Sequence, residues 1–329
     1  MTAPAIPNAL LWRRLHSLTG LWLVVYLTTH LLTNSQAALY IGDDGEGFIT
    51  AVQSIHHLPY LRAIEIFLLA LPFGIHIIYG LYRIFMAEPN SSPTDGSKPA
   101  LGQYPRNRAF TWMRITSWIL LFGVILHVLQ MRVLEYPWHT EKDGHQYFMN
   151  VLKLDSGLYT LSERLDVELY DAKRIERDTR RPLPPVEQAP IATSMLGEPA
   201  PEVFDQDQLQ QMRAWQNAQE ERQWIAALNK RPINQYEVVA VSKDFATSTL
   251  LVVRDTFKSP LMVALYSLFV LAACYHGFNG LWTFLITWGI TLTERSQRLA
   301  LWLSSFLMIV VAFLGLAAAV GTYWFNLRY

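Results

Sequence analysis

Four of the nine histidines in this 329-residue chain lie deep inside long apolar stretches. They are His30, His76, His127 and His276, one in each of four successive stretches. An ionisable side chain is expensive within a membrane helix and by default indicates a functional site, such as a metal ligand or a proton carrier. One such histidine could simply form an interhelical hydrogen bond, but four in successive helices indicate a common chemical role.

The stretches that carry these histidines have the length and composition of membrane-spanning helices. A helix needs about 20 apolar residues to cross a hydrocarbon core of about 30 Å. Five segments qualify, at approximately 15–36, 60–86, 112–135, 259–288 and 298–324. Pro72 lies inside the second segment, where a neighbouring helix is expected to satisfy the carbonyl group that proline leaves without a donor. The sequence therefore predicts an all-α membrane protein with five transmembrane helices, a four-helix core plus a fifth helix.

Composition argues against several other classes of protein. Only 16% of the residues are charged and the formal net charge is zero, with no basic tail or stripe, so a nucleic-acid partner is not expected. The single cysteine, Cys274, excludes an intrachain disulfide and a cysteine-based metal cluster. The first apolar stretch has no small-residue cleavage site, so we expect it to be retained as a helix.

The orientation follows from the short loops, because cytoplasmic loops of membrane proteins are enriched in Lys and Arg. Basic residues precede the first helix and occupy the second–third and fourth–fifth connections: Arg13, Arg14, Lys98, Arg106, Arg108, Arg295 and Arg298. The first–second connection is acidic instead, with Asp43, Asp44 and Glu46. We therefore expect a cytoplasmic N-terminus and an outer C-terminus. Helices one to three then occupy residues 1–137, an extracytoplasmic insertion occupies 138–258, and helices four and five occupy 259–329.

The charged residues are concentrated in the insertion, which carries no Gly-rich phosphate loop and no hydrolase motif. It contains a Pro-rich linker at 181–190 and a predicted helix around 206–229. Residues 236–254 are compatible with two short strands joined by a turn, or with one strand leading into an interfacial segment. A cap that packs over the outer loops is the simplest interpretation of the insertion.

The depths of the four histidines group them into two pairs. The first and third helices run outward, and the second and fourth run inward. At 1.5 Å per residue, His30 and His127 lie roughly 10 Å below the outer surface, and His76 and His276 roughly 15–18 Å above the inner surface. Each level holds one diagonal pair of a four-helix bundle, which is the arrangement that axial ligation of a flat macrocycle requires. The sequence thus predicts two bis-histidine haems, which would transfer electrons rather than bind oxygen.

Other interpretations of the pairs fit less well. A zinc site uses three or four converging ligands, and a proton relay does not require pairing by depth. Small residues near the histidines would leave room for a haem ring, or would simply allow close helix packing. They are Gly20, Gly74, Gly80, Gly123, Gly277 and Gly280.

Three stretches of the sequence resemble a known family: RRLHSLTG (13–20), LPYLRAIEIFLLALPFGIHIIYGLY (58–82) and YHGFNGLWTFLITWGITLTERSQR (275–298). They are similar to the cytochrome b membrane anchor of succinate:menaquinone oxidoreductases and fumarate reductases. The resemblance is to the type with a single anchor subunit, five helices and two haem b groups, and it does not extend to the insertion. It implies that His30 and His127 hold the outer, distal haem and that His76 and His276 hold the inner, proximal haem, in agreement with the pairing by depth.

The resemblance also implies partners and a location. A flavoprotein that oxidises succinate and an iron–sulfur protein would dock on the cytoplasmic face of a bacterial cytoplasmic membrane and pass electrons through the haems to menaquinone. This chain has no flavin fingerprint and no cysteine spacing for iron–sulfur ligation, so it would not act on succinate by itself. A higher-order oligomer and the physiological direction of the reaction stay open.

Several polar residues are candidates for supporting roles. Glu65, in the outer part of the second helix, could protonate a quinone or could pair with Arg62. His16, Ser17 and Arg13, at the inner end of the first helix, could bond a propionate of the proximal haem or cap the start of the helix.

The remaining histidines lie outside the spans and are interpreted as surface residues: His56, His57, His139 and His145. In one alternative, His56 or His57 borders the quinone site. Some relatives carry a glutamate, used as a proton path, two residues before the last ligand. This chain has Cys274 there.

Two rival functions remain from the sequence. The chain could be a haem-containing anchor for a hydrogenase or a formate dehydrogenase, although such anchors usually have fewer spans and a different ligand spacing. It could instead be a haem-free membrane scaffold or transporter.

Overall fold

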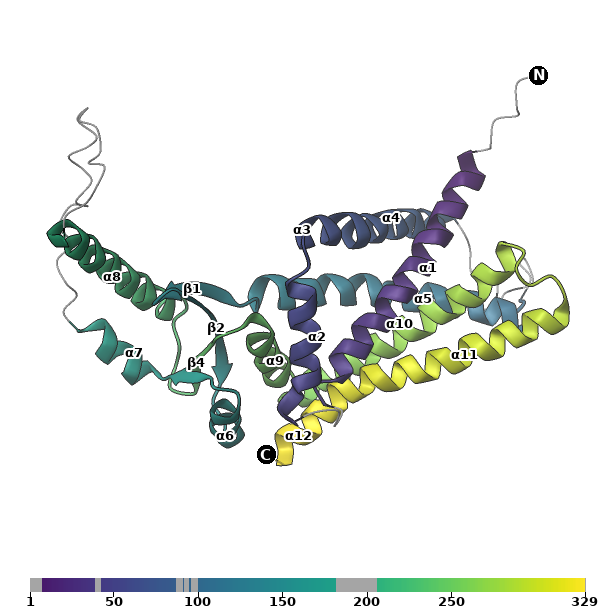
Figure 1. The fold of residues 1–329 in the computed structure, drawn as a ribbon. Coiled ribbons are helices and arrows are strands. Elements are labelled where there is room, and N and C mark those ends of the chain that lie inside the picture. The colour runs from purple at the N-terminus through teal and green to yellow at the C-terminus, as the bar shows by residue number, and fades with distance from the viewer. Residues whose placement is uncertain are drawn as a thin grey trace, which may run out of the picture. The chain divides into compact units, whose positions relative to one another are not determined.

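The computed structural model describes residues 8–38, 43–86, 91, 95, 100–181 and 206–328 (Figure 1). Lys98, and all but the first residue of the expected Pro-rich linker at 181–190, lie outside these ranges. The chain divides into two compact units, Met1–Val133 with Thr256–Arg328, and Leu134–Asp255.

The first unit contains five helices that are long and apolar enough to cross a membrane: Asn8–Ser35, Leu61–Met86, Pro105–Leu134, Pro260–Thr287 and Glu294–Leu327. They correspond to the five predicted spans, so the prediction of five helices with the length and composition of membrane spans is confirmed. A short helix that the sequence analysis did not predict, α2 (Glu46–His56), follows a 3₁₀ turn, η1 (Asp43–Gly45), between the first two spans.

Three of the five spans are not uniform α-helices. The second consists of α3 (Leu61–Ile64), a π-helical segment η2 (Glu65–Ala70) and α4 (Leu71–Met86). The third consists of α5 (Pro105–Val128) and a π-helical segment η3 (Leu129–Leu134). The first and fourth are α1 (Asn8–Ser35) and α10 (Pro260–Thr287), and the fifth combines α11 (Glu294–Leu316), η5 (Ala317–Gly321) and α12 (Thr322–Arg328).

The proline in the second span is compensated as the sequence analysis expected. Pro72 has no N–H to donate back to the preceding turn, which includes the carbonyl of Leu68. The indole Nε1–H of Trp22, from α1, donates to this carbonyl instead. The neighbouring helix thus satisfies the carbonyl that proline leaves free, and in a hydrocarbon environment an unsatisfied carbonyl would cost several kcal/mol.

The tightest packing in the first unit joins α1, α10 and α11. Val24, Leu31, Val270, Cys274, Phe278 and Val311 form a buried cluster among these helices. Figure 1 shows α10 and α11 side by side. Gly315 permits this approach, because a Cβ atom there would lie 2.6 Å from Val270 Cγ1 and 3.0 Å from Leu31 Cδ1.

The four histidine-bearing helices form a ring in the order α4–α1–α10–α5. Extensive packing joins α1 to α4 and to α10, and joins α10 to α5. Arg114 of α5 donates to the carbonyl of Ile84 in α4 over 3.1 Å. Along their described lengths α4 buries none of its side chains and α5 buries only Thr116. Both helices therefore keep apolar side chains for lipid or a cofactor to cover.

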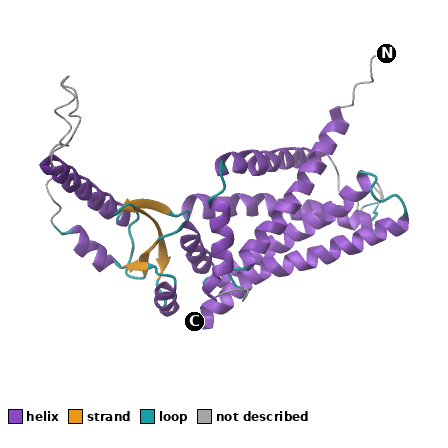
Figure 2. Cartoon of the chain, viewed as in Figure 1, coloured by secondary structure: helices purple, strands orange, loops and turns teal. Residues whose placement is uncertain are grey.

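The second unit corrects the prediction of an all-α fold. It contains a four-stranded antiparallel sheet in the order β1–β2–β4–β3 (Figure 2). The strands are β1 (Trp138–Lys142), β2 (His145–Lys153), β3 (Glu168–Tyr170) and β4 (Glu237–Ser242). Asp143 and Gly144 join β1 to β2, both with positive φ (51° and 73°). An Asp-Gly pair is a strong signal for such a hairpin, and the sequence analysis overlooked it.

Helices cover both faces of this sheet. α7 (Ala172–Thr179) and α8 (Gln206–Leu228) contribute Ile175, Trp224 and Leu228 to one buried cluster. α6 (Ser156–Arg164) and α9 (Phe245–Thr256) contribute Leu158 and Leu251 to the cluster on the other face. The predicted helix around 206–229 is confirmed as α8. For residues 236–254 the alternative with two strands is wrong, because one strand, β4, is followed by helix α9.

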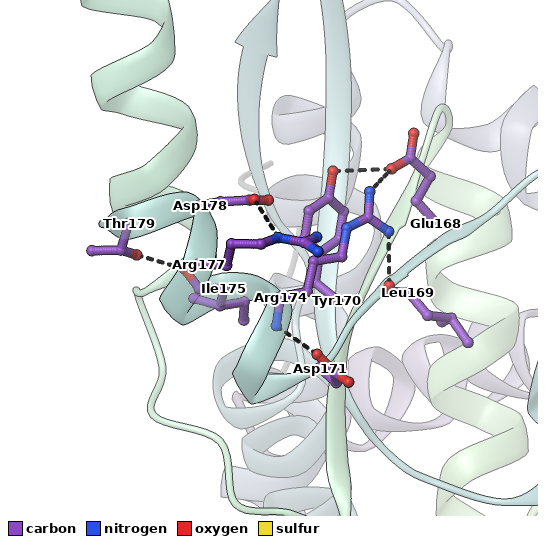
Figure 3. A network of polar contacts seen from close by, with 9 residues as sticks. All are labelled: Glu168, Leu169, Tyr170, Asp171, Arg174, Ile175, Arg177, Asp178 and Thr179. Atoms are coloured by element: carbon purple, nitrogen blue, oxygen red, sulfur yellow. Dashed lines mark hydrogen bonds and ion pairs between the residues drawn. The ribbon is translucent and has the colours of Figure 1, made fainter. Parts of the chain in front are cut away.

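A network of polar contacts holds edge strand β3 against helix α7 (Figure 3). The Asp171 carboxylate accepts a hydrogen bond from the backbone N–H of Arg174 and caps the helix. The Arg174 guanidinium lies 3.7 Å from the Tyr170 ring centroid and donates to the carbonyl of Leu169 and the carboxylate of Glu168. Burial, together with the hydrogen bond to Glu168, raises the pKa of Tyr170 to about 12. These contacts pair the charge of Arg174 with that of Glu168 and join β3 to α7.

Candidate metal centres

The structure brings the four intramembrane histidines together as two pairs. The ring centroids of His30 (α1) and His127 (α5) are 5.9 Å apart, with ring planes at 76°. Those of His76 (α4) and His276 (α10) are 6.3 Å apart, with ring planes at 79°. Each pair joins two helices that stand across the ring of four.

These separations fit one metal ion between each pair. A metal–imidazole nitrogen bond is about 2 Å long, so two imidazoles on opposite sides of one ion have ring centroids about 6 Å apart. Among the described residues, no group of three or more His, Cys, Asp or Glu side chains could hold a metal ion. Two protein ligands per ion are what axial coordination of a haem uses.

Hydrogen bonds fix which ring nitrogen faces the partner histidine at the inner pair. The Nδ1 atom of His76 lies 3.2 Å from the carbonyl oxygen of His16. A carbonyl only accepts, so Nδ1 carries the proton. The Nδ1 atom of His276 lies 3.3 Å from Thr116 Oγ1, whose hydroxyl hydrogen is directed to the carbonyl of Trp112. Both histidines therefore keep an unprotonated Nε2, the form that binds a metal.

In the outer pair the His127 ring is fixed by a longer chain of hydrogen bonds. The hydroxyl of Tyr266 donates to Gln130 Oε1 over 3.0 Å. Its oxygen therefore accepts from Nδ1 of His127, at 3.1 Å. This leaves Nε2 of His127 unprotonated as well. Hydrogen-bonded outer partners of this kind orient metal-binding histidines and are typical of such sites.

Two of the small residues singled out in the sequence lie close to the inner pair. A Cβ atom at Gly20 would lie 2.9 Å from His76 Cε1, so this glycine lets α1 approach the His76 ring. At Gly80 a Cβ atom would lie 3.6 Å from His16 Cε1. Cβ atoms at Gly74 and Gly280 would meet no atom of the protein within 4 Å.

The three residues predicted to bond a propionate of the proximal haem differ in their contacts and exposure. The His16 ring stacks on the His76 ring, with centroids 4.1 Å apart and planes at 14°. Nδ1 of His16 is buried and has no hydrogen-bond partner among the described residues. Ser17 instead accepts from the indole N–H of Trp288, and Arg13 is exposed. Of the three, His16 is the residue whose ring lies against the pair, and its Nδ1 has no partner among the described residues.

Glu65 forms an ion pair that the sequence analysis only partly predicted. Its carboxylate lies 3.6 Å from Arg62, as considered in the sequence analysis, but both of its oxygens also accept from Arg132 Nη2, at 3.0 and 2.9 Å. Arg132 was not among the predicted site residues, although it is a basic residue near the outer end of a span and five residues after His127. Glu65 and Arg132 both lie in π-helical segments, which are frequent at functional sites.

His56 lies at the end of α2 within electrostatic range of this ion pair. Burial lowers the pKa of His56, the positive charges of His57 and Arg132 lower it further, and Glu65 opposes them. His57, His139 and His145 are exposed, as predicted for surface residues.

Cys274 is buried in the α1–α10–α11 cluster, two residues before His276. A carboxylate would need a partner in such a place, whereas a thiol packs there as a small apolar group.

Fold and site together define a helical integral membrane protein whose bundle carries two intramembrane histidine pairs. Over 310 residues the chain is 26% identical to the succinate dehydrogenase cytochrome b558 subunit of Bacillus subtilis (strain 168). The alignment covers 93% of this chain and 94% of that protein. No family model and no solved structure matches the chain.

Proposed function

We propose that the chain is the dihaem cytochrome b membrane anchor subunit of a succinate:quinone oxidoreductase, which passes electrons from an iron–sulfur subunit to menaquinone. The observation that carries the proposal is the geometry of the two histidine pairs. In each pair the ring centroids are separated by the distance expected for two axial ligands of one haem iron. The near full-length similarity to a succinate dehydrogenase cytochrome subunit supports the choice of partner enzyme.

In this proposal His30 and His127 hold the distal haem, and His76 and His276 hold the proximal haem. Bis-histidine haem supplies one-electron transfer without an open position for oxygen. Hydrogen bonds hold His76, His276 and His127 with Nδ1 as the donor, which keeps Nε2 of these three imidazoles available and raises the basicity of the ligand. His16, with its unpartnered Nδ1, is the residue that we assign to a propionate of the proximal haem. Arg13 is a longer-range candidate, and Ser17 accepts from the indole N–H of Trp288 and keeps its own hydroxyl hydrogen for a propionate oxygen.

The proposed orientation places the N-terminus in the cytoplasm and both the insertion and the C-terminus outside a bacterial cytoplasmic membrane. It rests on the excess of Arg in the connections assigned to the cytoplasm. The flavoprotein and iron–sulfur subunits then dock on the cytoplasmic face, nearest the His76–His276 pair. Within the chain, 1–137 and 259–329 form the electron-transfer unit, and 138–258 forms an outer domain.

For quinone reduction we assign Glu65 to proton delivery on the outer side. Its ion pair with Arg132 places a carboxylate beside a guanidinium at the proposed outer level, where the carboxylate can exchange a proton and the guanidinium can donate to a quinone carbonyl oxygen. A Glu65→Gln variant should keep both haems and lose menaquinone reduction. Normal menaquinone reduction in this variant would refute the role of the carboxylate.

The haem assignment is tested with single substitutions. His30→Leu and His127→Leu should each remove the same one of two spectrally distinct haems, and His76→Leu and His276→Leu should each remove the other. Haem content that no substitution changes would refute the proposal. Purification in mild detergent tests the partner enzyme, because co-purified hydrogenase or formate dehydrogenase subunits would replace succinate dehydrogenase in the assignment.

A further inference from the structure

The two histidine pairs differ in how many of their rings are held by hydrogen bonds. At the inner pair both rings are held, His76 by the carbonyl of His16 and His276 by Thr116. At the outer pair only His127 is held, by Tyr266. Among the described residues the His30 ring has no hydrogen-bond partner, and its neighbour Tyr26 stacks on it at 5.4 Å without bonding it.

Tyr266 is itself firmly placed. Its ring packs edge-on against Phe257 and Phe269, with centroids 5.2 and 6.4 Å away. Its hydroxyl hydrogen is directed to Gln130 Oε1, and the amide of Gln130 in turn donates to the hydroxyl of the buried Thr256 over 3.4 Å. The hydroxyl oxygen is therefore presented to His127 with its lone pairs, and a hydroxyl that donates is also a better acceptor.

We infer that Tyr266, with its hydroxyl directed by Gln130, is the residue that positions the distal ligand His127 and lowers the reduction potential of the distal haem. The inference rests on the proposed haem site. An acceptor at Nδ1 increases the electron donation of an imidazole to the metal, which favours the oxidised ion. Tyr266 is a positioning residue in this role, because it acts through His127.

The test is a potentiometric titration of the haem absorbance in membranes that contain the full chain with its partner subunits. In Tyr266→Phe, which keeps the ring and removes the acceptor, two haems per chain should remain. The distal component, identified as the one absent from His30→Leu, should titrate at a higher potential. A change of up to about tenfold in its reduction equilibrium is about 59 mV for a one-electron couple. The proximal component should not move.

Tyr26→Phe is the matched control, because it removes a hydroxyl from a tyrosine that touches the same site without bonding a ligand. It should leave both potentials unchanged. An unchanged distal potential in Tyr266→Phe, or an equal shift in Tyr26→Phe, would overturn the inference while the haem assignment stood. A wild-type chain without haem would instead overturn the proposed function.

If Tyr266→Phe does not assemble, Gln130→Leu provides the second measurement. It keeps the phenol and removes the group that directs its hydrogen, so a smaller rise of the same component is expected. Two unchanged potentials in Gln130→Leu would then overturn the inference.

Discussion

A valine at Gly20 should selectively weaken the proximal haem site. The Cβ atom alone would lie 2.9 Å from His76 Cε1 and 3.4 Å from Nδ1, and the two methyl groups of valine reach further. His76 has little freedom to retreat, because its ring is stacked on His16 at 4.1 Å and its Nδ1 is bonded to the His16 carbonyl. Metal–ligand distances tolerate changes of only about 0.2 Å, so a displaced His76 can no longer coordinate well.

The size of the effect follows from the cost of overpacking. Extra methyl groups in a packed site typically cost about 1–3 kcal/mol, which corresponds to about 5- to 150-fold weaker binding. In cells with limited haem supply, Gly20→Val should therefore approach one haem per chain, and Gly20→Ala should lie between this variant and wild type. The distal haem in the same chain is the internal control. Two haems with an unperturbed proximal potential in Gly20→Val would refute the reasoning.

Three further predictions address the fold, the topology and the energetics. Trp22→Phe should destabilise the bundle by about 1–3 kcal/mol, because it removes the indole N–H that donates to the Leu68 carbonyl. The control is Trp302→Phe, at an exposed site. Equal melting midpoints of the two variants in detergent would contradict the prediction. Ser156→Cys, at the exposed start of α6, should react with an impermeant thiol reagent in intact cells. Gln103→Cys, in the exposed connection between the second and third spans, should react only after lysis. The reverse pattern would invert the proposed topology. In sealed vesicles with a membrane potential, succinate oxidation by menaquinone should slow when an uncoupler is added. The potential drives electrons outward, and each elementary charge that crosses the membrane is worth about 2.3 kcal/mol per 100 mV. An unchanged rate would exclude an electrogenic reaction.

Part of the candidate site could be predicted because its signals are local. Helical rise and the alternation of spans were enough to group the four histidines by depth, and the structure places the rings of each group next to each other. The groups that hold these rings could not be predicted. Tyr266 lies 139 residues from His127, and Thr116 lies 160 residues from His276. Such contacts depend on how each helix is rotated about its axis, which residue spacing within one helix does not specify.

The ion pair at Glu65 shows the same limit. Arg62 was considered as its partner because three residues separate the two along one helix. Arg132 is 67 residues away, and only the approach of the second and third spans brings its guanidinium to the carboxylate. Its closer contact makes it the principal partner.

The sequence by itself determined that the chain has five helices with the length and composition of membrane spans, and a histidine inside each of the first four. Apolar length and the cost of burying an imidazole are properties of single segments, so they can be recognised without tertiary structure. Only the tertiary structure decided that residues 134–255 contain a sheet covered by helices on both faces, and that Trp22 compensates Pro72. Strand pairing in the order β1–β2–β4–β3 joins segments almost a hundred residues apart, and a donor for a free carbonyl comes from whichever helix packs beside it. Both depend on contacts between distant parts of the chain.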